Sequence, residues 1–175
     1  MYLSIRHFYY GEVTIKILSQ KSYKDYNRSD VRCLGDDFFQ EPPKLLPSGK
    51  NKQSAFLILK TALGITTESE KLIITPVQEI VIKPNLLLHI VQKRNDAREK
   101  YANFIIPTLI NPFEVYNTEY EDGFRNQYIG LFKGTSNILV VIKTSSDGNL
   151  FWNMMHTDKR IINKHRVGEL IYYTK

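Results

Sequence analysis

The chain has 175 residues, of which 24 are basic and 18 acidic, giving a formal net charge of +6 with neutral histidines. The length suits one domain, or one domain with a shorter appendage, and the hydrophobic fraction of 42% excludes a wholly disordered chain. A single cysteine, Cys33, excludes an internal disulfide framework and any metal site built from several cysteines. No stretch approaches the length of a membrane span and the start lacks a signal-peptide pattern, so we expect a cytoplasmic site of action.

Residues 1–50 differ in pattern from the rest of the chain. Residues 12–19 alternate polar and apolar side chains, which predicts one strand. Three prolines and a glycine then fall within residues 38–52, which favours a linker or an arm laid on a neighbour. We therefore expect an N-terminal arm or small subdomain over 1–50 and a main domain over 51–175.

The main domain opens with helices and a hairpin. The apolar run 55–63 predicts a helix, and strands at 71–75 and 78–82 predict a hairpin. From Pro84 to Leu109, apolar residues recur at spacings of three, four and seven, which predicts one long helix with an apolar face.

Residues 113–175 are expected to form strands and a closing helix over 159–170. Turn-forming glycines separate four predicted strands, at 113–118, 127–133, 138–144 and 150–156. Helices followed by consecutive antiparallel strands make an α+β domain, with helices packed on a four-stranded antiparallel meander.

The polar face of the long predicted helix points to chemistry on a phosphate. His89 and Lys93 are four residues apart, so their side chains lie on one face, with Arg94 and Arg98 in a neighbouring row. A histidine beside fixed cations suits RNA cleavage, in which a base takes the proton of the ribose 2′-hydroxyl and cations stabilise the phosphorane. The alternative is a solvated helix face with an incidental histidine.

Three segments carry a family resemblance: HIVQKRNDAREKYA at 89–102, NPFEVY at 111–116 and RNQY at 125–128. They resemble the phage- and toxin-associated nuclease domains grouped with barnase, EndoU, colicin-type tRNases and RelE. The resemblance covers about residues 72–175 and does not reach 1–50. The matching residues are His89, Lys93, Arg94, Asp96, Arg98, Tyr101, Asn111, Pro112, Glu114, Arg125 and Tyr128.

The resemblance implies a barnase-like fold, with helices on one face of the sheet and RNA across the other face or along its edge. It implies an endoribonuclease, a toxin or phage effector that cleaves RNA by attack of the 2′-hydroxyl on the adjacent phosphate. Because no two-histidine-plus-carboxylate spacing argues for a bound metal, we expect this cleavage to be metal-independent. We expect tRNA as the substrate and an immunity or antitoxin protein as a partner, with delivery into a target cell as a further option. We expect no cofactor, no metal site and no membrane partner.

The expected catalytic set is His89 as general base or acid, Lys93 on the scissile phosphate, Arg125 for charge stabilisation and Glu119 as a carboxylate base. The expected nucleic-acid contacts are Arg94, Arg98, Tyr116, Tyr128 and Lys133. Since side chains alternate along a strand, 125 and 128 should lie on opposite faces. The remaining histidines show no partner at ligand spacing and are expected to be incidental: His7, His156 and His165.

Two alternative functions stay open. The chain could keep the nuclease fold as an inactive binding module of a phage or mobile element, for which the proline-rich segment 41–47 could supply a docking arm. It could also be a DNase, which ranks lower because paired acidic metal ligands are not evident at useful spacings.

Overall fold

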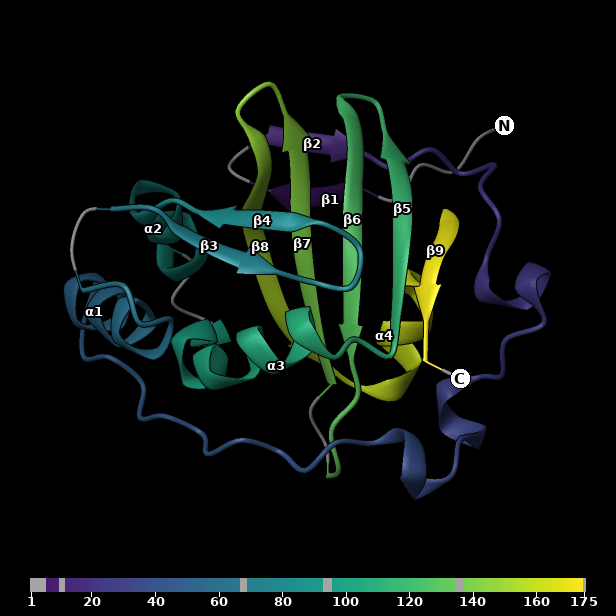
Figure 1. Cartoon of the computed structure of the whole chain (residues 1–175), viewed down its shortest axis with the longest axis horizontal. Coiled ribbons are helices and arrows are strands. Elements are labelled where there is room, and N and C mark those ends of the chain that lie inside the picture. The colour runs from purple at the N-terminus through teal and green to yellow at the C-terminus, as the bar shows by residue number, and fades with distance from the viewer. Residues whose placement is uncertain (1–5, 10–11, 67–68, 93–95, 135–136, 175) are drawn as a thin grey trace.

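A seven-stranded sheet organises the computed structural model, which describes residues 6–9, 12–66, 69–92, 96–134 and 137–174 (Figure 1). Its strand order is β3-β4-β8-β7-β6-β5-β9. The strands are β3 Lys71–Ile74, β4 Glu79–Ile82, β5 Glu114–Tyr120, β6 Gly123–Gly130, β7 Asn137–Ser145, β8 Gly148–Thr157 and β9 Glu169–Tyr173.

The predicted α+β class is confirmed, but the sheet has seven strands where four were expected. Strands β5 to β8 are antiparallel neighbours in chain order. The β3–β4 hairpin extends this sheet because β4 runs parallel to β8 at the pair Val81–Leu150. At the other end β9 pairs with β5, and only its first two residues, Glu169 and Leu170, fall within the predicted closing helix.

The closing helix ends earlier than predicted. Helix α4 spans Lys159–His165, and Gly168 then takes a positive φ of 116°, a conformation that glycine adopts without steric cost. The following residues alternate between exposed and half-buried, as expected of a strand, so β9 replaces the last turn of the predicted helix.

The single long helix predicted from Pro84 is wrong. The chain instead forms α2 (Pro84–Gln92), the 3-10 helix η5 (Arg98–Phe104) and α3 (Ile105–Ile110). Ala97 has a left-handed φ of 41°, which a continuous right-handed helix does not allow. The rows of charge expected along one helix face are therefore interrupted. Helix α1 (Lys52–Ala62) lies close to its prediction.

The sheet separates two clusters of buried apolar side chains. The first core cluster lies on the face covered by α1, α2 and α3 and includes Tyr128 of β6 and Val140 of β7. The second core cluster lies on the opposite face and includes the strand neighbours Ile129 and Val141. Successive side chains of a strand point to opposite faces, so each strand contributes to both clusters.

Residues 23–39 cover the second core cluster. Tyr23, Val31 and Phe39 are buried there with Ile162 of α4. In Figure 1 the chain passes from this region beneath the sheet to α1. The expectation that RNA lies across this face is therefore wrong over the cluster, because the protein's own side chains occupy it. An edge of the sheet remains as the expected RNA position.

Buried ion pairs and hydrogen bonds hold residues 23–39 against the sheet. Glu114 accepts hydrogen bonds from Arg166 Nε at 2.7 Å and Nη2 at 2.8 Å, and from Arg28 Nε at 2.7 Å. Glu114 and Arg166 are both fully buried, and Arg166 Nη1 also donates to the Ser29 carbonyl at 2.8 Å. One network thus joins the N-terminal segment, β5 and the turn before β9.

The first two strands form a separate antiparallel pair, β1 (Arg6–Tyr9) and β2 (Glu12–Ile15). The strand predicted at 12–19 thus begins where expected and ends sooner. The chain then follows the edge of β5, where Lys16 bridges Tyr120. None of the helices in the described ranges is long and apolar enough to span a membrane.

Candidate active site

Strand β8 is contacted by the two elements that carry His89 and Arg98, two of the expected nuclease residues. Strand β4 pairs with β8 near Leu150, so the second half of β8 extends beyond β4. Both α2 and η5 contact β8, and α2 also contacts η5.

Arg98 is fixed at this edge by hydrogen bonds from both ends of its guanidinium. Nη1 donates to Asn153 Oδ1 at 2.7 Å, while Nη2 donates to Asp96 Oδ2 at 2.9 Å. The Arg98 side chain is only 12% exposed. A guanidinium held in this way is a positive charge at a defined place, which suits an anionic ligand and loses little side-chain entropy on binding.

A second histidine lies beside Arg98, and sequence reasoning missed it. The ring of His156 on β8 stacks on Tyr101 of η5, with centroids 4.0 Å apart and planes 14° apart. Burial lowers the pKa of His156, Asp96 opposes this shift, and the cations Arg98 and Lys100 reinforce it. Because 55 residues separate Tyr101 from His156, no local spacing could have revealed the pair.

His89 lies on the last turns of α2, half-buried, while its neighbours Ile90 and Val91 pack into the first core cluster. Burial lowers the pKa of His89 and a hydrogen bond with Gln92 opposes the shift. A neutral imidazole at neutral pH can accept a proton, so His89 has the protonation state that a general base needs. Lys93 and Arg94, the cations expected beside it, lie outside the described residues.

Arg125 is not brought together with His89. The residue is 1% exposed, and its guanidinium donates to both carboxylate oxygens of Asp122 at 2.9 and 2.7 Å and lies 4.2 Å from the centre of the Tyr120 ring. Alternation along β6 places it on the face of the second core cluster, so the expected separation from Tyr128 is confirmed. In the sheet, β7 separates β6 from β8, the strand that α2 contacts.

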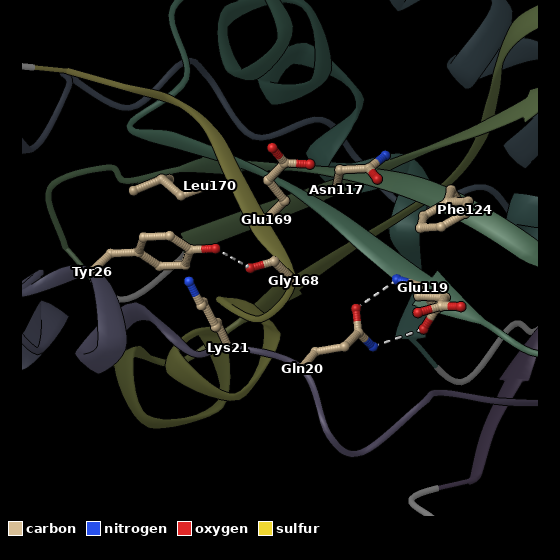
Figure 2. A pocket seen from close by; sticks show the side chains of 9 residues that line it. All are labelled: Gln20, Lys21, Tyr26, Asn117, Glu119, Phe124, Gly168, Glu169 and Leu170. Carbon is tan, nitrogen blue, oxygen red and sulfur yellow. Dashed lines mark hydrogen bonds between the residues drawn. The ribbon is translucent and has the colours of Figure 1, made fainter.

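Glu119 lies at the opposite edge of the sheet, in a groove of about 500 Å³ between β5, β9 and the N-terminal segment (Figure 2). Its carboxylate is exposed, while its backbone N–H and C=O are bound by the side chain of Gln20. Figure 2 shows Tyr26 and Lys21 on the other side of this groove. Glu119 is therefore remote from the edge that holds His156.

The three remaining candidates make internal contacts. Tyr128 is buried and its hydroxyl lies 2.9 Å from Thr75 Oγ1, and Tyr116 is buried with its hydroxyl donating to Glu114 at 2.8 Å. Burial raises the pKa of both tyrosines, so both hydroxyls stay protonated. Lys133 is exposed and pairs with Glu41. Neither tyrosine ring offers a stacking surface in this conformation.

Metal ligands do not gather at either edge. In the part of the chain that the structure describes, no three His, Cys, Asp or Glu side chains are placed to hold a metal ion. The side chains described at the β8 edge are imidazole, guanidinium, phenol and amide groups and the single carboxylate of Asp96. These groups can exchange protons and stabilise negative charge, the two operations that phosphodiester cleavage through a neighbouring hydroxyl requires.

Comparison with protein families assigns the class of the chain. Residues 59–173 match the model of a family described as "phage-Barnase-EndoU-ColicinE5/D-RelE like nuclease2". The chain belongs to this nuclease family. Comparisons with curated proteins and with solved structures gave no match. The family match includes α2, η5 and β8, and hence every residue of the β8 edge, so the resemblance expected from the sequence is confirmed.

Proposed function

We propose that this nuclease is a metal-independent endoribonuclease, a toxin or phage effector, with tRNA as its expected substrate. One observation carries the assignment to RNA: α2, which bears His89, contacts both β8 and η5, and Arg98 of η5 is anchored on Asn153 of β8. A proton acceptor and a fixed cation on neighbouring elements are the groups needed when the attacking nucleophile is the substrate's own 2′-hydroxyl.

In the proposed reaction His89 removes the proton from the ribose 2′-hydroxyl, and the 2′-oxygen attacks the adjacent phosphorus. Arg98 stabilises the charge that develops on the phosphate oxygens, and we assign Lys93 and Arg94 to the same role from their positions in the family motif. Cleavage leaves a 2′,3′-cyclic phosphate and a free 5′-hydroxyl. Arg125 and Glu119, which were also expected in the catalytic set, lie away from this edge and have no step in the mechanism.

The first prediction concerns His89. Wild-type protein incubated with total RNA in EDTA should cleave it, and His89→Ala should lower the rate by a factor of about 10² to 10⁴, the usual contribution of a general base. Gel electrophoresis gives the rate, and chemical mapping of the cut ends should give 2′,3′-cyclic phosphates. Leu88→Ala, on the same helix and 44% exposed, is the matched control and should keep wild-type activity.

Other results of the cleavage experiment would favour one of the two alternative functions. RNA binding without cleavage would support an inactive binding module, and magnesium-dependent degradation of plasmid DNA would support a DNase. Full activity in His89→Ala would contradict the proposed base. A neutralising antitoxin stays a proposal that follows from the family, and co-expression rescue of a toxic wild-type protein would test it.

A further inference from the structure

The stacked rings of Tyr101 and His156 are held in place by the geometry of η5 and β8. In a 3-10 helix, side chains three residues apart lie one above the other. Arg98 and Tyr101 are separated by three residues in η5, so both face β8, where they meet Asn153 and His156 respectively. The 3-10 geometry of η5 thus aligns these two side chains along β8.

The orientation of the His156 ring is fixed from several sides. The Tyr101 ring covers one face of the imidazole, and Tyr101 itself contacts Phe104, with centroids 5.8 Å apart, at the rim of the first core cluster. The backbone of His156 is held in the sheet, opposite Ile138 of β7. A half-buried imidazole whose plane is fixed can deliver a proton in a defined direction without a prior rearrangement.

The charges near His156 suit a phosphate ligand. Arg98 and Lys100 are close enough to influence its titration, and Asp96 lies on the same segment. Burial lowers the pKa of His156 and the two cations lower it further, whereas Asp96 raises it; a bound phosphate anion raises it as well and so favours the protonated imidazole once substrate is in place. Burial lowers the pKa of His89 as well, and a hydrogen bond with Gln92 opposes that shift.

We propose that His156 is the general acid of the reaction, the group that protonates the 5′-oxygen as it leaves. This inference rests on the proposed endoribonuclease function. The bond between the 2′-oxygen and phosphorus forms while the bond between phosphorus and the 5′-oxygen breaks. The 2′-hydroxyl proton passes to His89, and the proton on His156 passes to the 5′-oxygen, so the protein ends with its two protonation states exchanged. Water then returns the protons.

The test uses a substrate that needs no acid. An RNA oligonucleotide is made with the mapped cleavage site, and a second carries sulfur in place of the bridging 5′-oxygen at that site. Because a thiolate leaves without protonation, loss of a general acid slows cleavage of the oxygen substrate selectively. His156→Ala should lower the rate on the oxygen substrate by a factor of about 10² to 10⁴ and change the rate on the sulfur substrate several-fold at most. His89→Ala should slow both substrates.

The outcomes distinguish the two proposals. If wild-type protein cleaves neither substrate, the proposed endoribonuclease function fails, and this inference fails with it. If wild-type protein cleaves both and His156→Ala slows them equally or not at all, only the role of His156 is overturned. His156→Phe preserves an aromatic ring against Tyr101 and replaces the alanine variant if urea unfolding shows that His156→Ala is not folded.

Discussion

At the scale of single residues, Glu114 shows how a motif side chain can serve the fold. It belongs to the NPFEVY segment, and a carboxylate in a nuclease motif invites a catalytic interpretation. The structure instead surrounds it with Arg166, Arg28 and the Tyr116 hydroxyl, with no exposed surface. A buried carboxylate is tolerated when its hydrogen-bonding capacity and charge are satisfied in this way.

Removing that charge should therefore destabilise the protein. Glu114→Gln leaves Arg166 and Arg28 without their counter-ion, and we expect the free energy of unfolding to fall by about 3 to 5 kcal/mol, measured by urea denaturation. The control is Glu41→Gln, at an ion pair whose side chains are 77% and 46% exposed, which should change stability by less than about 1 kcal/mol. Equal effects of the two substitutions would show that burial of the network contributes little.

At the scale of elements, the turn between α4 and β9 depends on one glycine. Gly168 has a φ of 116°, and a Cβ at that position would lie 2.2 Å from the carbonyl oxygen of Asn117 on β5. The approach is close because the Gly168 carbonyl accepts from Tyr26 and its N–H donates to Lys21. Only a residue without a side chain allows β9 to begin here beside β5.

Gly168→Ala should lower the melting temperature more than Gly123→Ala does. Both glycines have nearly the same φ, 116° and 118°, but no atom lies within 4 Å of a Cβ added at Gly123. Gly123→Ala therefore measures the conformational cost alone, about 1 to 2 kcal/mol, and the difference between the variants measures the steric conflict. Similar melting temperatures, recorded by circular dichroism, would show that the turn relaxes without cost.

At the scale of the whole molecule, the segment 23–39 completes the second core cluster. Without it, the apolar side chains of β5, β6 and β7 on that face would be exposed to water, together with Glu114 and Arg166. The family match begins at residue 59, so these contacts come from chain outside the matched region. The division into units at residues 1–50 and 51–175 stays a prediction that truncation can test.

A chain that starts at residue 41 should lose cooperative unfolding. It lacks Tyr23, Val31 and Phe39 and leaves an apolar face uncovered, so we expect a shallow urea transition and aggregation on size-exclusion chromatography. Removal of residues 1–14 is the control and should preserve the transition, because the described contacts to this cluster begin at Tyr23. A sharp transition near the wild-type midpoint in the shorter chain would instead favour a separable N-terminal arm.

The sequence predicts regular elements better than it predicts the site. Alternation and turn residues locate the hairpin and the strands of the meander, because those signals are local. The apolar spacing from 84 to 109 cannot reveal the break at Ala97, since α2, η5 and α3 all turn their apolar residues toward one core. The pairing of Tyr101 with His156 and the burial of Arg125 depend on contacts between distant parts of the chain, which no local pattern records.

The ion-pair network also sets an order of events during synthesis. Arg28 meets Glu114 across 86 residues, and Arg166 meets Ser29 across 137. The N-terminal segment leaves the ribosome long before Arg166. Tyr23, Val31 and Phe39 are therefore synthesised well before the strand residues that they contact in the second core cluster. Closing such long loops comes late in folding. Strand β8, which carries His156, precedes Arg166 in the chain. The ion pairs of Arg166 beside the second core cluster form only after this later residue has been synthesised. The buried network around Glu114 is therefore complete only after Arg166 has left the ribosome.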